Sequence, residues 1–186
     1  METSVLQPMA STLKKQAETV LQTPTMADVE QIQKWYQDPE LAEYFRRFPP
    51  LCEWRLPEQT LAGITPGLVI YEGSKLVGLC QLVGYDASVQ STDIGLLVDN
   101  SLCTNRKEVS QQAYIQITDY LFGALDYTKL YMKVLPHRTK LIARLQEGGW
   151  SIEGRLRDSV KFKGEFKDEI LLGLLKKDWQ SWKDKY

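Results

Sequence analysis

The sequence predicts an α+β fold, with a mixed and mostly antiparallel sheet flanked by helices. Segments with strand and helix periodicity follow one another as one strand, two helices, three strands, helix, strand, helix and two strands. The composition is typical of a globular domain, since 43% of the 186 residues are hydrophobic and 25% are charged. A chain of this length buries enough surface to form a core without disulfides or metal ions.

The first elements are a strand and two helices. Alternation of side-chain polarity predicts a strand over residues 19–23. Thr25 and Asp28 have the spacing of a capping box, which predicts a helix that begins there. Its end is expected near Asp38, because the proline that follows disfavours helical backbone in the residue before it. A second short helix is expected over residues 40–46.

Three consecutive strands are expected next. Two apolar runs within residues 67–85 are separated by Gly73-Ser74, and a two-residue turn of this kind predicts a β-hairpin. Residues 92–99 alternate and predict the following strand. An apolar stripe then predicts a helix from Asn105 to about Ala124.

Strands and a helix alternate over the remaining chain. The expected strands are 129–135, 150–157 and 168–175, and the expected helix is 139–147. The Gly148-Gly149 pair is typical of a helix C-terminus. We therefore expect one domain over residues 18–179, with an N-terminal extension, residues 1–17, and a polar C-terminal tail, residues 180–186.

Several classes of protein are not predicted. The first residues lack a basic and an apolar region, so we expect no signal peptide. No apolar run approaches about 18 residues, so we expect no membrane span and a cytoplasmic protein. Three cysteines without a C-x-x-C pair and a single histidine, His137, predict neither a disulfide framework nor a metal site.

The charges are distributed unevenly. The formal net charge is −1, but residues from Lys129 onward carry +6 and the first 128 carry −7. A basic C-terminal third suits an anionic ligand, although a solvated basic surface is an equally ordinary explanation. Since no dense stripe of Lys and Arg with interleaved aromatics is present, nucleic acid is not expected as a partner.

The C-terminal segment carries most of the residues that resemble a known family. They are Gly149, Trp150, Glu153, Gly154, Arg157, Gly164, Asp168, Leu172, Leu175 and Trp179. Earlier matches are Asp28, Trp35 and Asp38-Pro39, the hairpin at Tyr71–Gly78, and Asp93-Ile94-Gly95. In this order, over about residues 19–179, they resemble the GNAT superfamily of N-acetyltransferases. More narrowly, they resemble the branch that acetylates ribosomal-protein N-termini and related small amines.

The resemblance implies a fold, a donor and an acceptor. In the GNAT fold the fourth and fifth strands splay apart and admit the pantetheine arm of acetyl-CoA. The implied acceptor is an amine, on a small molecule or a protein N-terminus. Asp93 is the implied catalytic base, with a solvated strand-end carboxylate as the alternative. Trp35 and Tyr85 are implied to border the acceptor site, with ordinary core and strand positions as the alternative.

The implied cofactor-binding residues include a loop that departs from the family pattern. They are Leu97, Val98, Arg106, Lys107, Val109, Ser110 and Arg138. The family loop has two glycines whose amides reach the pyrophosphate, and here their positions are Arg106 and Glu108. A carboxylate about 4 Å from a phosphate costs roughly 4 kcal/mol at an effective dielectric near 20. Glu108 has a second explanation, because Asn105 and Glu108 have the spacing of a helix cap.

Two functions therefore stay open at this point. Arg106 and Lys107 side chains can replace the glycine loop, which makes the protein an acetyl-CoA-dependent N-acetyltransferase. Alternatively, a GNAT-fold protein with a degenerate loop has lost CoA binding and acts as a binding or assembly module with a protein partner. Many relatives have a tyrosine as general acid where this chain has Leu145.

Overall fold

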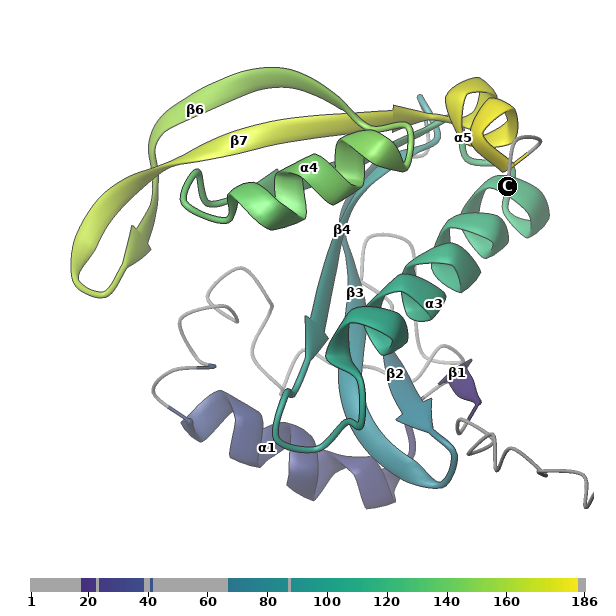
Figure 1. The fold of residues 1–186 in the computed structure, drawn as a ribbon, viewed down its shortest axis with the longest axis vertical. Helices are drawn as coiled ribbons and strands as arrows, with labels where there is room; N and C mark the ends of the chain where they lie inside the picture. The colour runs from purple at the N-terminus through teal and green to yellow at the C-terminus, as the bar shows by residue number, and fades with distance from the viewer. Residues whose placement is uncertain (1–17, 23, 39–40, 42–66, 87, 184–186) are drawn as a thin grey trace, which may run out of the picture.

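The computed structural model of the chain describes residues 18–22, 24–38, 41, 67–86 and 88–183. A seven-stranded sheet forms its centre (Figure 1). The strands are β1 (Thr19–Gln22), β2 (Gly67–Glu72), β3 (Lys75–Asp86), β4 (Ser91–Val98), β5 (Lys129–Val134), β6 (Ser151–Phe162) and β7 (Glu165–Leu175). The helices are η1 (Met26–Asp28), α1 (Val29–Gln37), α3 (Arg106–Asp119), η4 (Tyr120–Ala124), α4 (Thr139–Glu147) and α5 (Lys176–Lys183). Within these ranges, no helix is both long enough and apolar enough to span a bilayer.

The sheet has the order β1-β2-β3-β4-β5-β7-β6. Every neighbouring pair is antiparallel except β4 and β5, which are parallel. The predicted α+β class with a mixed, mostly antiparallel sheet is therefore confirmed. The β4–β5 ladder extends over three residue pairs and ends at Asp93 and Tyr131. Since β4 runs on to Val98 and β5 to Val134, the two strands part beyond this point.

The N-terminal elements follow the local signals in the sequence. Thr25 and Asp28 form the predicted capping box, in which the Thr25 amide donates to Asp28 Oδ2 at 2.6 Å. The first turn, η1, is a 3₁₀ turn, and α1 ends with Asp38 as its C-cap. The β2–β3 hairpin turns at Gly73, whose φ of 63° favours glycine. The helix expected over residues 40–46 lies outside the described residues, Leu41 apart.

Helices cover both faces of the sheet. On one face, Ile32 and Trp35 of α1 pack with Leu97 of β4. On the other face, Val109 and Ala113 of α3 pack with Val98, because successive strand residues point to opposite faces. The predicted apolar stripe of α3 continues through Ile117 to Leu121 in η4, a π-helical turn, and these residues are buried, whereas Ala124 at its predicted end is exposed.

The C-terminal hairpin is longer than predicted. β6 and β7 have 12 and 11 residues, and the hairpin turns at Lys163-Gly164, both at positive φ. Register shifts after Ile152 and after Leu156 mark irregularities in β6. Such bulges bend a strand and increase its twist, and the hairpin curls over α4 in Figure 1.

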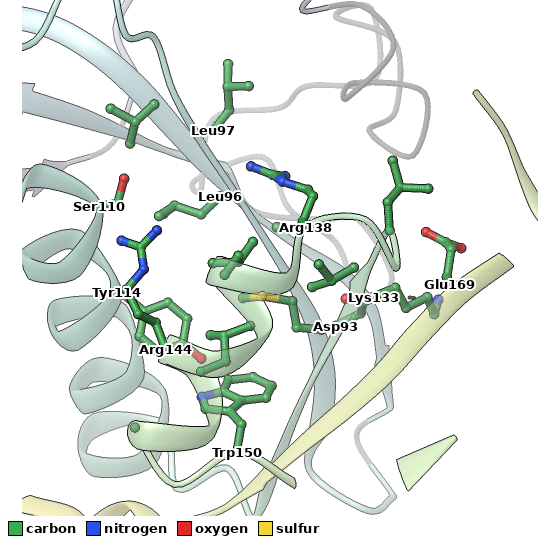
Figure 2. A pocket seen from close by; sticks show the side chains of 18 of the residues that line it. Asp93, Leu96, Leu97, Ser110, Tyr114, Lys133, Arg138, Arg144, Trp150 and Glu169 are labelled. Carbon is green, nitrogen blue, oxygen red and sulfur yellow. Dashed lines mark ion pairs between the residues drawn. The ribbon is translucent and has the colours of Figure 1, made fainter. Parts of the chain in front are cut away.

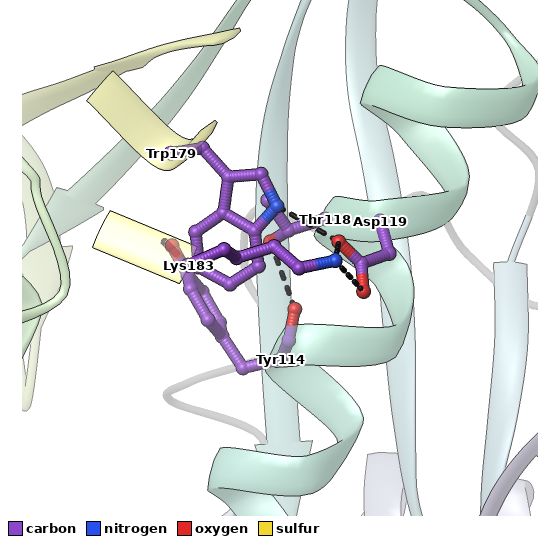
Figure 3. Close-up of polar contacts among 5 residues, drawn as sticks. All are labelled: Tyr114, Thr118, Asp119, Trp179 and Lys183. Atoms are coloured by element: carbon purple, nitrogen blue, oxygen red, sulfur yellow. Dashed lines mark hydrogen bonds and ion pairs between the residues drawn. The ribbon is translucent and has the colours of Figure 1, made fainter. Parts of the chain in front are cut away.

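Residues 176–183 form helix α5, where the sequence suggests a polar tail from residue 180. Its anchor is Trp179, which is 3% exposed and whose indole N–H donates to Asp119 Oδ1 at 2.8 Å (Figure 3). Lys183 Nζ binds the same carboxylate at 2.9 Å. The Trp182 ring stacks on Trp179 with centroids 4.9 Å apart. These aromatic residues therefore pack on the domain through the C-terminal end of α3.

Candidate functional site

A cavity of 1360 Å³ occupies the opening between β4 and β5. It is lined by β4 from Asp93 to Val98, by β5 from Met132 onward, and by side chains of α3, α4 and the β6–β7 hairpin (Figure 2). Side chains on both faces of β4 contribute, including Leu96 toward α3 and Leu97 toward α1. The cavity therefore passes through the sheet and joins its two faces.

The N-terminus of α3 forms one wall of this cavity. Asn105 is the N-cap, and its Oδ1 accepts from the amide of Glu108 at 3.4 Å. The Glu108 carboxylate accepts from the side-chain amides of Asn105 at 3.3 Å and Gln112 at 3.4 Å. Arg106, Lys107 and Ser110 line the cavity. Glu108 does not, because its contacts hold it along the helix.

Two buried carboxylates support the connection that leads from β4 into α3. Asp99 accepts from the Ser101 amide and hydroxyl at 2.8 and 2.7 Å, and from the Trp35 indole at 2.8 Å. Glu72 accepts from the Thr104 amide at 2.9 Å and from its hydroxyl. Burial favours a raised pKa for Asp99, but the hydrogen bonds and the nearby Arg106 charge outweigh it and lower the pKa. Hydrogen bonds to these two buried carboxylates thus fix the connection that leads into α3.

Basic side chains gather at the end of the cavity between α3 and α4. Arg106 and Lys107 come from the first turn of α3, Arg138 precedes α4, and Arg144 lies within it. Glu147, the last residue of α4, also lines the cavity. Helix geometry also leaves the first amides of α3 without intrahelical acceptors, and the helix dipole makes this end positive. The combined charge suits an anionic group such as a phosphate.

Acidic side chains lie toward the other face, where β4 and β5 begin to part. Asp93 Oδ2 binds Lys133 Nζ of β5 at 2.9 Å. Glu169 of β7 is 2% exposed and accepts from the Ser159 hydroxyl of β6. All four side chains line the cavity, and Figure 2 shows Asp93, Lys133 and Glu169 close together. This end therefore combines two carboxylates with one ammonium group, beside the point where the sheet opens.

Comparisons with known proteins agree with this geometry. The chain is 25% identical over 165 residues to the uncharacterised N-acetyltransferase p20 of Bacillus licheniformis, across 83% of this chain and 90% of that protein. It is 26% identical over 150 residues to YdaF of Bacillus subtilis (strain 168), provisionally named a ribosomal N-acetyltransferase, across 79% of each. No family model matches the chain. Among solved structures, spermidine N-acetyltransferase from Vibrio cholerae in complex with CoA and spermine superposes with a TM-score of 0.74. That similarity has 16% identity and covers 87% of this chain and 98% of the other.

The chain has the GNAT fold. The parallel β4–β5 pair, the opening beyond it and the helix that starts beside the opening are its central features here. Within the described residues, no group of three or more His, Cys, Asp or Glu side chains is placed to hold a metal ion.

Most of the site residues predicted from sequence meet in this cavity. Those that line it are Asp93, Leu97, Val98, Arg106, Lys107, Ser110 and Arg138. Val109 does not line it: its side chain is 2% exposed in the core beneath α3, and its amide donates to the Asn105 carbonyl. The Val109 side chain therefore belongs to the core, and the predicted role of this residue in cofactor binding stays a prediction.

The two predicted acceptor residues have different outcomes. Trp35 is 2% exposed, packs with Leu97 and Leu79, and uses its indole N–H for Asp99. It does not line the cavity, so the core alternative is correct, because the face of α1 that carries it lies directly on the sheet. Tyr85 lies in β3, but its side chain is outside the described part of the chain and its role stays a prediction.

Several cavity residues were not predicted from sequence. They are Lys133, Glu169, Arg144, Tyr114 and Trp150. Strand alternation gives a partial signal for Lys133, which lies two residues beyond the last β4–β5 pair. The others become neighbours only through the packing of α3, α4 and the long β6–β7 hairpin, which no local pattern specifies.

Proposed function

We propose that the protein is an acetyl-CoA-dependent N-acetyltransferase that acts on an amine acceptor. The observation that carries this proposal is the cavity through the β4–β5 opening, with basic side chains at one end and Asp93 at the other. An anionic carrier and a cationic acceptor require opposite charges at opposite ends. A cavity that passes through the sheet lets the two substrates meet from opposite faces.

The basic end is assigned to the phosphates of the donor substrate. Arg106 and Lys107 replace the glycines of the family loop with side-chain charges, and Arg138 and Arg144 face them from the α4 side. Guanidinium groups bind phosphate oxygens through paired hydrogen bonds. Because Asn105 and Gln112 hold Glu108 along the helix and it does not line the cavity, its carboxylate opposes this binding less than one that faces the phosphates.

The residues at the other end suit acyl transfer to an amine. Attack requires a neutral amine, and Asp93 is the carboxylate placed to accept the proton that this amine loses as the C–N bond forms, at the point where the strands part. The backbone of β4 from Gly95 to Val98 borders the opening. An amide N–H in this position is suited to polarise a thioester carbonyl, as fixed backbone donors do in other acyl transferases.

The acceptor is assigned as a primary amine on a small molecule, with a protein N-terminus as the second candidate. The structural neighbour that holds CoA and spermine supports the first. The provisional name of YdaF supports the second. Asp93 and Glu169 give the acceptor end two carboxylates, which attract either kind of ammonium group.

The test is a titration followed by a transfer assay. Acetyl-CoA is titrated into the full chain by calorimetry at low and moderate salt. We expect binding that weakens with salt, because exposed charges are screened. The protein is then incubated with acetyl-CoA and spermidine, benzylamine or a peptide with a free N-terminus, and thiol release and acetylated product are measured. Binding of acetyl-CoA without transfer to any acceptor contradicts the proposed acetyltransferase activity. Absence of binding at millimolar acetyl-CoA favours a non-catalytic module.

A further inference from the structure

An ion pair bridges the two strands at the point where the sheet opens. Lys133 Nζ lies 2.9 Å from Asp93 Oδ2, and the two side chains are 35% and 19% exposed. Asp93 is in the last β4–β5 pair, and Lys133 is two residues beyond its partner Tyr131. By strand alternation, Tyr131 and Lys133 share a face of β5. The pair therefore lies where the backbone ladder ends and the cavity begins.

We propose that Lys133 is the proton donor to the sulfur that leaves during acyl transfer, and that Asp93 and Lys133 form a proton relay. This inference rests on the acetyltransferase activity proposed above. In this arrangement Asp93 receives the proton that the amine loses, and Lys133 supplies the proton that the thiolate needs. One ion pair thus serves both proton transfers of the reaction.

The protons and bonds balance in the following sequence. A neutral amine forms a C–N bond with the thioester carbonyl carbon, and its N–H proton passes to the Asp93 carboxylate. The C–S bond breaks, and the sulfur takes a proton from the Lys133 ammonium. The proton on Asp93 then crosses the 2.9 Å contact to the neutral Lys133 amine. The products are an amide and a free thiol, and the ion pair is restored.

The other proton donors along the cavity are less suited to this step. The Tyr114 hydroxyl is shielded from solvent and has no hydrogen-bond partner among the described residues, and burial raises its pKa well above the usual range. Arginine does not release a proton in proteins. Lys107 lies in the first turn of α3 at the basic end, and Lys161 lies near the end of β6. Lys133 is therefore the donor that stands at the opening itself.

Charged side chains lie on the strands around Lys133. Asp93 faces it from β4, Glu169 lies on the neighbouring strand β7, and Lys161 lines the same cavity from β6. Proton uptake by Asp93 removes the negative charge that lies nearest to Lys133.

The experiment compares two acyl donors in full-length variants. Lys133→Met removes the proton donor, and Lys177→Met, which removes one exposed positive charge from α5 outside the cavity, is the control. Each variant is assayed with acetyl-CoA and with 4-nitrophenyl acetate, using the best acceptor of the amine panel. Since 4-nitrophenolate leaves without a proton, its displacement does not need Lys133. Because a partly exposed ion pair contributes little stability, we expect Lys133→Met to fold.

We expect Lys133→Met to lower kcat with acetyl-CoA about 100-fold, within the usual contribution of general acid–base catalysis. The KM for acetyl-CoA and the rate with 4-nitrophenyl acetate should change less than about threefold, as should every value for Lys177→Met. Wild-type or higher kcat in Lys133→Met overturns the proposal and identifies Lys133 as a competitor of the acceptor. Equal loss with both donors overturns it as a structural effect. Absence of transfer by the wild type refutes the acetyltransferase assignment, and the relay with it.

Discussion

The charges at the start of α3 make a quantitative prediction about CoA affinity. Arg106 lines the cavity, whereas Glu108 is held by the side-chain amides of Asn105 and Gln112 and does not. Two single variants separate their effects. Arg106→Ala removes a positive charge at the basic end, and Glu108→Gln removes a negative charge two residues away without changing side-chain size.

The expected magnitudes follow from distance and exposure. A unit charge 4 Å from a phosphate contributes about 1 kcal/mol in water and about 4 kcal/mol at an effective dielectric of 20. Because Arg106 is exposed, its contribution lies near the lower value, so we expect Arg106→Ala to raise the Kd about fivefold to tenfold. We expect Glu108→Gln to change the Kd less than about threefold. If its carboxylate faced the phosphates, the same substitution would tighten binding about a thousandfold.

The assay is calorimetric titration of CoA at two salt concentrations. Lys177→Ala is the matched control, because it removes one exposed positive charge from α5 and does not line the cavity. The Kd of this control should stay within about twofold of wild type, and Arg106→Ala should show a weaker salt dependence than the control. Unchanged affinity in Arg106→Ala, or a tightening beyond tenfold in Glu108→Gln, refutes the assignment of this helix end to phosphate.

Three further predictions concern the surroundings of the site. In Gly78→Ala the new Cβ would lie 2.3 Å from the Leu97 carbonyl oxygen, so the strand backbone must shift. We expect the free energy of unfolding in urea to fall by about 2 kcal/mol and CoA binding to weaken. Wild-type values for both quantities contradict this prediction. Trp179→Phe removes the indole donor to Asp119 and should lower the free energy of unfolding by about 1 kcal/mol. Trp179→Ala also removes buried apolar surface and should lower it by about 4 kcal/mol. Equal losses in calorimetric melting would show that the hydrogen bond, not packing, dominates. Because the pKa of Asp99 is lowered, its contribution to stability is present above about pH 4 and is lost as pH falls below that value. Asp99→Asn should therefore weaken the fall in unfolding free energy at acid pH. An unchanged acid limb of the stability–pH curve refutes this contribution of Asp99.

Much of the fold follows from short-range signals in the sequence. The Thr25–Asp28 capping box, the turn at Gly73 and the apolar stripe of α3 each act within a few residues, and each structure formed as predicted. The residues at the start of α5 are compatible with a helix, but they do not indicate that Trp179 packs on the domain. Trp179 packs because Asp119, 60 residues earlier, offers it an acceptor.

The candidate site was predicted less evenly, for the same reason. Leu97 and Arg106 were expected only through the resemblance to the GNAT superfamily, and both line the cavity. Trp35 was misplaced because a helix face shows which residues point together but not whether they meet the sheet or a cavity. Lys133 was missed because its partner Asp93 is 40 positions away, and only the parallel pairing of β4 and β5 brings the two together.

The short β4–β5 ladder has a consequence for how the site can evolve. Beyond Asp93 and Tyr131, the facing edges of two central strands present main-chain groups to a cavity and not to each other. A ligand with amide groups can pair with such an edge as an additional strand does, whatever the side chains of β4 are. Because this recognition uses main-chain groups, it depends on the separation of β4 and β5 more than on the side chains of the two strands. Side-chain substitutions near the opening therefore need not disturb a ligand that pairs with the backbone edge.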